Sequence, residues 1–328
     1  MSIVKAIRYY RYGSPEVLRL EDIDLPALGD EDVLIRVRAA SVNPLDWHFI
    51  RGAPYIARAG KGLLRPSNGG VGVDLAGCVE KVGKDVTRFA PGDEVFGCAS
   101  ALGSLAEYIS LRQDGAVLAK PPNQSFEQAA SAPVAGCTAL QGLRDHGHLQ
   151  PGQKVLVNGA AGGVGTFTVQ VASALGAEVT GVCSTGNVQM VASIGASRVI
   201  DYTRQDFTRS AQRYDLLIDI AGSRPFTAYR RVLTPQAMVV GIGGPNKGRV
   251  LGPMTRVIKA LLLSRFTSQR VTFFIAKPNS GDLAVLRDLL VAGKVTPVID
   301  RSYPLSEAPE AIRYLEQGHA RGKVVITM

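Results

Sequence analysis

The sequence predicts an α/β chain that combines a doubly wound parallel sheet with a smaller β-rich domain preceding it. Short strands broken by Gly and Pro fill residues 1–122. From residue 123 onward, near-continuous apolar strands alternate with helical stretches, which is typical of βαβ units in a sheet buried on both faces. A glycine-rich turn within residues 155–165 joins the first of these strands to the first helix. A length of 328 residues also favours more than one domain.

The β-rich domain is predicted from closely spaced strands with turn signals between them. Residues 33–42 (VLIRVRAASV) alternate around Arg36 and Arg38, and residues 72–83 (GVDLAGCVEKVG) form a second apolar strand. The strand DEVFGCA follows the PGD turn at residues 91–93. Many short strands at this spacing indicate a small barrel-like domain.

The parallel sheet is predicted from strands and helices in strict alternation. We expect strands at 154–159 and 178–184 and from 198, 215 and 237 onward, and helices at 163–176 and 187–195. After a strand at 271–277 we expect helices at 281–292 and 306–317 and strands at 294–300 and 323–328. The pattern alone leaves open whether these last elements extend the parallel sheet or return to the first domain.

Composition narrows the classes of function. Apolar residues make up 46% of the chain and the formal net charge is +9, with basic residues scattered rather than massed. We therefore expect no nucleic-acid partner, and a basic surface that attracts an anionic nucleotide. The cysteines (Cys78, Cys98, Cys137 and Cys183) lack CxxC spacing, which predicts free thiols. No signal peptide or membrane span is evident, so we predict a cytoplasmic protein without stable membrane anchoring.

The glycine-rich turn VLVNGAAGGVG, residues 155–165, matches the Rossmann dinucleotide fingerprint. It places Ala160, Gly162 and Gly165 at the three glycine positions of that fingerprint. Gly162 would let the backbone approach a pyrophosphate, and Gly165 would let helix and strand pack closely. The N–H groups at the helix start, including those of Gly163 and Val164, would then point at phosphate. The alternative is a structural glycine turn without a ligand.

The end of the next strand indicates which dinucleotide binds. An NAD-binding site places Asp or Glu there to bind the ribose 2′-hydroxyl. Here the strand ends Cys183-Ser184-Thr185-Gly186-Asn187, without a carboxylate. Ser184, Thr185 and Asn187 instead offer neutral polar partners, so we predict NADP(H).

Taken together, several motifs resemble the medium-chain dehydrogenase/reductase superfamily in its zinc-free quinone oxidoreductase branch. They are SVNPLDWH, GVDLAGCVEKVG, PGDEVFG, AAGGVG, VIDY and the tail GHARGKVVI. The resemblance implies a GroES-like catalytic domain (1–122), a Rossmann domain (123–277) and a return segment of the catalytic domain (278–328), with the active site in the cleft. It also implies a homodimer formed through edge strands of the Rossmann domains, where VTFFIA falls.

The resemblance further implies a set of cofactor contacts. Asn43 and Thr138 would contact the nicotinamide side, Tyr202 the 2′-phosphate, and Phe274 and Lys323 would close the site. The positions predicted to bind the cofactor are Asn43, Thr138, Ala160, Gly162, Gly163, Val164, Gly165, Ser184, Asn187, Tyr202, Gly222, Gly241, Ile242, Phe274 and Lys323. Relatives often carry Lys or Arg just after the second strand, where this chain has Gly186; Lys323 and Arg321 are the other cations predicted for that role.

Zinc ligands of the related alcohol dehydrogenases are replaced in this chain. At the matching positions it has Asn43, Val73 and Val134. Val cannot ligate a metal and neutral Asn is a poor zinc ligand, so we predict no metal. Without a Lewis acid, quinones and α,β-unsaturated carbonyls are the favoured acceptors, because conjugation spreads the incoming charge.

Candidate catalytic residues follow Asn43 in the sequence. His48 could donate a proton or hydrogen-bond a carbonyl oxygen. Asp46 and Tyr55 complete the candidates, although for Asp46 a structural role through backbone N–H bonds is the favoured alternative. Trp47 and Tyr55 could line a planar apolar pocket, with plain packing as the alternative.

We therefore predict an NADPH-dependent reductase of quinones or enones. The alternative is a nucleotide-binding sensor, structural or RNA-binding protein on the same fold, with little turnover. The apolar stretch 252–266, with its Arg and Lys residues, is predicted to be a helix packed on the cleft or on a partner subunit; contact with a membrane surface is the alternative.

Overall fold

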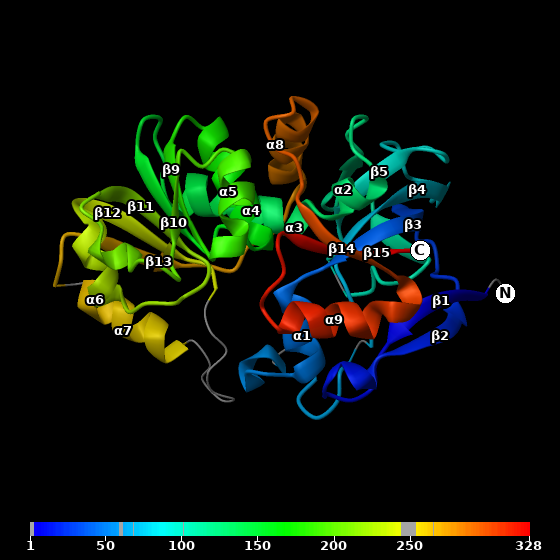
Figure 1. Ribbon diagram of the computed structural model, residues 1–328. Coiled ribbons are helices and arrows are strands. Elements are labelled where there is room, and N and C mark those ends of the chain that lie inside the picture. The colour runs from blue at the N-terminus through cyan, green and yellow to red at the C-terminus, as the bar shows by residue number, and fades with distance from the viewer. Residues whose placement is uncertain (1–2, 59–61, 68, 101, 244–253, 265) are drawn as a thin grey trace. The chain divides into compact units, whose positions relative to one another are not determined.

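In the computed structural model the chain forms two compact units (Figure 1). The structure describes residues 3–58, 62–67, 69–100, 102–243, 254–264 and 266–328. Unit 1 comprises Met1–Val134, Pro278–Ala292 and Pro297–Met328, and unit 2 comprises Ala135–Lys277 and Gly293–Thr296. The chain therefore passes between the units at 134/135, 277/278, 292/293 and 296/297. The domain boundaries at 122/123 and 277/278 stay predictions.

Unit 1 is built on β-strands. Its two-stranded sheet pairs β1 with β2, and its larger sheet has the order β14-β15-β3-β4-β5-β7, with β6 pairing β3. The strands are β1 (Ile3–Arg8), β2 (Arg19–Asp24), β3 (Asp32–Val42), β4 (Asp74–Val82), β5 (Glu94–Cys98), β6 (Tyr108–Arg112), β7 (Val117–Ala119), β14 (Ile299–Pro304) and β15 (Lys323–Thr327). The helices are α1 (Pro44–Arg51), α2 (Phe126–Ala130), α8 (Ser280–Val291) and α9 (Ala308–Glu316).

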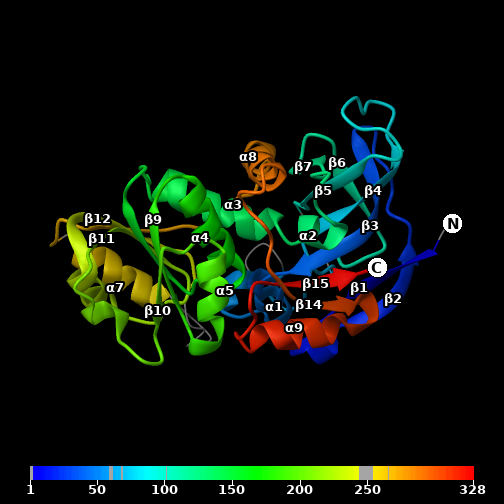
Figure 2. The same ribbon diagram turned by 45° about the horizontal axis from the view of Figure 1, so that its top comes forward.

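The C-terminal tail completes the large sheet of unit 1. Strand β15 lies antiparallel to β3, with Val324 opposite Val42, and parallel to β14. Helix α9 packs beside α1, as both views show (Figures 1 and 2). Every residue of β15 from Lys323 to Ile326 is buried, because this strand lies between two others. The tail is therefore part of the first unit.

Unit 2 is built on a six-stranded parallel sheet of order β10-β9-β8-β11-β12-β13. Its strands are β8 (Lys154–Asn158), β9 (Glu178–Cys183), β10 (Arg198–Asp201), β11 (Tyr214–Asp219), β12 (Leu233–Gly241) and β13 (Arg270–Phe273). Its helices are α4 (Gly163–Ala174), α5 (Val188–Ser193), α6 (Phe226–Tyr229) and α7 (Met254–Ser264), and α3 (Pro133–Gln141) begins at the boundary. This strand order is that of the predicted doubly wound fold.

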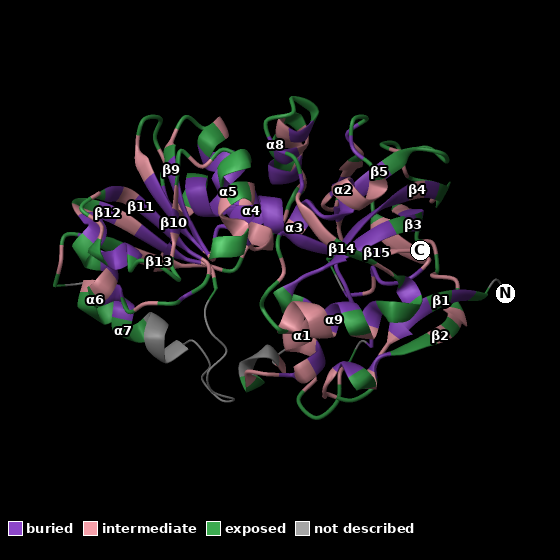
Figure 3. Cartoon of the chain, viewed as in Figure 1, coloured by how far each residue is buried: buried purple, intermediate pink, exposed green. Residues whose placement is uncertain are grey.

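Burial explains why these segments form the centre of unit 2. Val155, Leu156 and Val157 of β8 are fully buried, as are Leu217 and Ile218 of the neighbouring strand β11. A strand without a solvent-facing side needs a continuous apolar run, which is what the sequence shows. Figure 3 shows β11 mainly in the colour of buried residues. Parallel pairing brings the carboxyl ends of the strands to one edge of the sheet.

The strand predicted at 294–300 is wrong for its first half, because β14 begins only at Ile299. Residues 293–296 instead belong to unit 2. There the Gln170 side chain accepts a hydrogen bond from the Thr296 N–H (2.8 Å) and donates one to the Thr296 carbonyl (3.0 Å). This amide replaces a neighbouring strand, and Pro297 has no N–H with which to continue a ladder.

Helix α7 covers most of the helix predicted at 252–266; residues 252, 253 and 265 lie outside the described residues. The helix packs against β13, with Ala260 buried. Ile258, Leu261, Leu262 and Leu263 are exposed. Across the described part of the chain, no helix is long and apolar enough to span a membrane.

Candidate functional site

The turn between β8 and α4 has the geometry of a phosphate-binding loop. Gly159 has a positive φ of 94°, and Gly162 is the N-cap of α4, where no side chain caps the helix. A Cβ built on Gly162 would meet only the Gly159 oxygen, at 3.7 Å, so the space in front of this residue is open. A Cβ on Gly165 would collide with that same carbonyl group. The loop thus leaves room for a ligand at Gly162 and requires close packing at Gly165.

The first N–H groups of α4 are available to an anion. Thr166 donates to the Gly162 carbonyl (2.9 Å) at the start of the helical ladder. The N–H groups of Gly163, Val164 and Gly165 precede that bond and have no partner in the helix. Ala160 is held by its own N–H, which donates to Val182 of β9 (3.0 Å). A diphosphate fits this loop, since its backbone donors and the helix dipole both favour negative charge.

The carboxyl ends of β9 and β10 bring a carboxylate to the loop predicted to read the ribose. Asp201 pairs with Cys183 in the parallel register. Its Oδ2 accepts a hydrogen bond from the Thr185 hydroxyl at 2.6 Å. Sequence reasoning examined only residues 184–187 and missed Asp201, although the VIDY motif places it directly before Tyr202. Ser184 accepts from the Asn187 amide (3.1 Å), and Tyr202 is exposed.

The ends of β8 and β11 are joined by a buried polar network. The Asn158 amide donates to Asp219 Oδ1 (2.7 Å), to Ser223 and to the Tyr229 hydroxyl. The same Asp219 oxygen accepts from the Gly222 N–H (2.9 Å). Gly222 has a positive φ of 60°. The network therefore fixes the turn that carries the predicted cofactor residue Gly222.

The other predicted cofactor residues of unit 2 lie at the ends of β12 and β13 and on α3. Gly241 ends β12, and the Ile242 N–H donates to the Asp219 carbonyl (3.0 Å). The Phe274 ring stacks on His146, with the centroids 4.1 Å apart. Ile242 and Phe274 both approach Gly142, in the π-helical turn that follows α3. Thr138 is buried on α3.

In unit 1, Asn43 belongs to a buried cluster of polar and charged groups. Its amide donates to Asp74 Oδ2 (2.9 Å), and its carbonyl oxygen accepts from Lys323 Nζ (2.6 Å). Asp74 is 0% exposed and also accepts from the Ser41 hydroxyl and the Val134 N–H, each at 2.9 Å. Lys323 lies 3.4 Å from this carboxylate. The cluster therefore orients the Asn43 side chain through both of its polar atoms.

Lys323, also predicted as a cation for the 2′-phosphate, has its side-chain partners within this cluster. Its ammonium group faces three oxygens, those of Val42 (3.3 Å), Asn43 and Asp74, and the residue is 3% exposed. An ammonium group has three donors, so these partners use all of them. Lys323 acts here as the counter-charge of a buried carboxylate. Its predicted place at the cofactor stays a prediction.

Asp46 lies at the first turn of α1 and caps it. Its Oδ2 accepts from the Asn43 N–H at 2.7 Å, while Oδ1 is buried without a hydrogen-bond partner among the described residues. Burial raises the pKa of this carboxyl group to about 7, and the nearby Asp74 also raises it. The geometry supports the structural alternative for Asp46.

Replacing Asp46 with Asn is expected to change how stability depends on pH. The folded chain keeps the Asp46 proton up to a pKa of about 7, whereas an unfolded chain releases it near pH 4. The contribution of this group to the free energy of unfolding is therefore greatest below pH 4 and falls as the pH rises to 7. When the pH is raised from 5 to 8, the free energy of unfolding of Asp46→Asn should increase by about 2–3 kcal/mol relative to that of the parent. Urea unfolding of the parent and the variant at pH 5 and at pH 8 measures this difference.

The exposed residue Asp24 provides the control for this substitution, since it lies in the same unit. Asp24→Asn should leave the pH dependence unchanged. If Asp46→Asn also gives a curve parallel to that of the parent, Asp46 is not held neutral in the folded chain.

His48 is held through one of its ring nitrogens by a backbone carbonyl group. Its Nδ1 lies 2.8 Å from the Ala53 carbonyl, which can only accept, so Nδ1 carries the proton and Nε2 carries none. Burial lowers the pKa of the ring, which disfavours the doubly protonated form. The proton-donor role predicted for His48 stays a prediction. The ring also stacks on Trp47, with the centroids 3.8 Å apart.

Tyr55 is half-exposed and contacts a cation. The guanidinium of Arg58 lies 4.7 Å from the Tyr55 ring centroid and 4.4 Å from that of Tyr12. Arg58 also donates to the Gly52 carbonyl at 2.9 Å. These contacts tie the loop after α1 to the N-terminal segment, and a catalytic role for Tyr55 stays a prediction.

The positions that match zinc ligands do not fit a metal. Asn43 is held by Asp74 and Lys323, Val73 is buried, and Val134 contributes its backbone N–H to Asp74. Among the described residues, no three or more His, Cys, Asp or Glu side chains form a group that could hold a metal ion. Neither valine offers a donor atom in its side chain.

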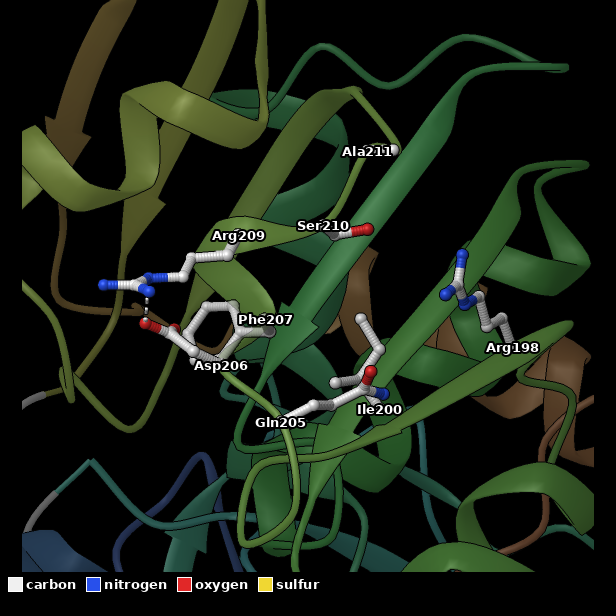
Figure 4. Close-up of a pocket in the computed structure, with 8 residues that line it drawn as sticks. All are labelled: Arg198, Ile200, Gln205, Asp206, Phe207, Arg209, Ser210 and Ala211. Carbon is white, nitrogen blue, oxygen red and sulfur yellow. Dashed lines mark ion pairs between the residues drawn. The ribbon is translucent and has the colours of Figure 1, made fainter.

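A pocket of about 370 Å³ lies beside β10 in unit 2 (Figure 4). Arg198, the first residue of β10, and Arg209, which pairs with Asp206, lie at its border. The phosphate loop and Thr185 lie instead at the carboxyl ends of the strands. The lining of the pocket also includes Ile200 and Gln205, so the pocket reaches the turn that follows β10.

The fold and the phosphate loop define a dinucleotide-binding chain of the Rossmann type with an added β-rich unit. Family models match residues 29–122 as "Alcohol dehydrogenase GroES-like domain" and residues 194–326 as "Zinc-binding dehydrogenase". The chain is 35% identical to the mouse (Mus musculus) mitochondrial NAD(P)H oxidoreductase RTN4IP1, covering 97% of this chain and 87% of the relative. It is 34% identical to 2-methylene-furan-3-one reductase of Solanum lycopersicum, covering 99% and 79%.

A solved structure, the quinone oxidoreductase from Coxiella burnetii, is similar over 100% of both chains, with a TM-score of 0.88 and 31% identity. The chain therefore belongs to the medium-chain dehydrogenase/reductase superfamily, in its quinone oxidoreductase-like branch. This confirms the resemblance and the predicted fold class.

Proposed function

We propose that this chain is an NADPH-dependent reductase that delivers hydride to a quinone or an α,β-unsaturated carbonyl without a metal ion. Membership of the superfamily supports the general assignment as an NAD(P)H-dependent reductase. The observation that supports it most directly is the open space at Gly162 beside the free N–H groups of α4. Bound NADPH would supply the hydride, and the protein would supply binding and orientation.

The residues of each unit would divide this work. In unit 2, Gly162, Gly163 and Val164 would hold the pyrophosphate through their N–H groups. In unit 1, the remaining N–H of the Asn43 amide would donate to the nicotinamide ribose, with its direction set by Asp74 and Lys323. His48 Nε2 would accept rather than donate, so solvent is the proposed proton source.

The choice of acceptor follows from the residues at the metal positions. Val73 and Val134 cannot hold a Lewis acid that would stabilise an alkoxide. In a quinone or enone, hydride addition places the charge on a conjugated oxygen, and positioning alone can then suffice. The names of two similar proteins, a quinone oxidoreductase and 2-methylene-furan-3-one reductase, are consistent with this substrate class.

A panel of small quinones and enones, assayed with NADPH and with NADH, tests this function. We expect NADPH oxidation with at least one acceptor, unchanged by a chelator, and no stoichiometric zinc by elemental analysis. Nucleotide binding without turnover would favour the sensor alternative. One tightly bound zinc per chain, with activity lost in chelator, would refute the metal-free mechanism.

The oligomeric state and the cellular location are further proposals. Strand β13 pairs only with β12 among the described strands, and Ile275 beyond it is 88% exposed. A second copy of the chain pairing at this edge would form the predicted homodimer, which analytical ultracentrifugation tests. A cytoplasmic location stays a prediction, because similar proteins include one named as mitochondrial.

A further inference from the structure

The 2′-phosphate of NADPH needs a cation, and none lies in the loop that follows β9. Residues 184–187 are Ser, Thr, Gly and Asn, and Lys323 uses its donors within unit 1. The structure instead places the ionised side chain of Asp201 against Thr185. A carboxylate alone at this position would repel a phosphate of two negative charges. If the proposed use of NADPH is correct, another group must offset it.

The turn after β10 supplies such a group. Arg204 lies three residues beyond Asp201, and its Nε is 3.5 Å from Asp201 Oδ2. The same oxygen accepts a hydrogen bond from the Thr185 hydroxyl at 2.6 Å. One carboxylate oxygen of Asp201 therefore contacts both the Arg204 guanidinium and Thr185, which lies in the loop predicted to contact the ribose.

The position of Asp201 is itself well determined. Its Oδ1 accepts from the Thr203 N–H (2.9 Å) and from the Thr203 hydroxyl (2.7 Å). The Thr185 hydroxyl, foremost, lowers the pKa of the Asp201 carboxyl group, so it is ionised at neutral pH. The Arg204 and Gln205 N–H groups both donate to the Asp201 carbonyl at 3.1 Å, which closes the turn.

Arg204 keeps donors for a ligand. The ion pair uses its Nε, and within the part of the chain that the structure describes its terminal nitrogens contact no acceptor. The Arg204 side chain is 76% exposed, so it can turn toward a bound phosphate. A guanidinium presents paired donors that match two phosphate oxygens.

We propose that Arg204 supplies the cation that binds the 2′-phosphate of NADPH, and that Asp201 positions it beside Thr185. This inference rests on the proposed function and adds to it the residue that selects NADPH over NADH. Without Arg204, the Asp201 carboxylate would repel the phosphate and could accept a hydrogen bond from the free 2′-hydroxyl of NADH. A single arginine thus reverses the preference set by the carboxylate.

Binding of 2′,5′-ADP and 5′-AMP to the full chain, measured by calorimetry, tests the inference without any need for turnover. The variant Arg204→Gln should bind 2′,5′-ADP about 10- to 100-fold more weakly, the effect of a lost charge-assisted hydrogen bond. Binding of 5′-AMP should not change. Arg209→Gln is the matched control, because Arg209 forms the same kind of i,i+3 ion pair, with Asp206 at 3.8 Å, in the same unit.

The outcomes separate the two proposals. If the parent binds 2′,5′-ADP and Arg204→Gln binds it equally well, Arg204 is not the phosphate ligand, while the proposed function stands. An equal loss for 5′-AMP also overturns the inference, since the residue then acts on the whole loop. If the parent binds neither nucleotide, the proposed function itself fails.

Discussion

Gly162→Val is expected to weaken NADPH binding by at least about 100-fold while the chain stays folded. A valine side chain would occupy the open space in front of the loop, where the backbone must approach the pyrophosphate. Losing two or more charge-assisted N–H contacts accounts for an effect of this size. The fold should survive because Gly162 has φ −82° and ψ 176°, values that a β-branched residue adopts readily. Calorimetry with NADPH measures the loss, and circular dichroism checks the fold.

Two further variants make this result specific. Gly281→Val adds the same side chain to the exposed first turn of α8 and should leave NADPH affinity unchanged. Gly165→Ala should instead destabilise unit 2, because its Cβ would collide with the Gly159 carbonyl. Unchanged affinity in folded Gly162→Val would mean that this loop does not bind the pyrophosphate.

Lys323→Met is expected to lower the free energy of unfolding by about 3–5 kcal/mol, the usual cost of leaving a buried charge without its partner. Asp74 would keep three hydrogen bonds, from Ser41, Asn43 and Val134, but would lose its counter-charge. Asn43 would lose the donor to its Oδ1, so the cofactor affinity of the folded fraction should also fall. Urea unfolding measures the first effect and NADPH titration the second.

The chain contains a matched control for this buried pair. Lys5 and Asp22 lie 3.3 Å apart, close to the 3.4 Å of Lys323 and Asp74, but both side chains are more than half exposed. Lys5→Met should therefore cost less than about 1 kcal/mol. Adding Asp74→Asn to Lys323→Met should recover part of the stability. A loss for Lys323→Met no greater than that for Lys5→Met would show that the buried pair is not coupled.

The predictions that depended on local pattern agree with the structure. Three consecutive segments are examples: the apolar run of β8, the glycine-rich turn and the apolar helix α4. Each can be recognised from the spacing of its apolar residues and glycines alone. The same alternation predicted parallel pairing, whereas the order of the strands is given by the structure. The strand expected at 294–300 failed because the Gln170 side chain, far away in sequence, takes the hydrogen bonds of Thr296.

By itself the sequence determined the two types of unit, the phosphate loop and the absence of side-chain ligands at Val73 and Val134. Only the tertiary structure decided which charged groups meet. Lys323 reaches Asn43 because β15 pairs with β3, and Asp201 reaches Thr185 because β10 pairs with β9. The physical reason is that hydrophobic periodicity and turn chemistry act between near neighbours, whereas the partners of a polar side chain depend on the register of strands far apart in sequence. Tertiary packing around α1 also buries Asp46, and no local pattern specifies that burial.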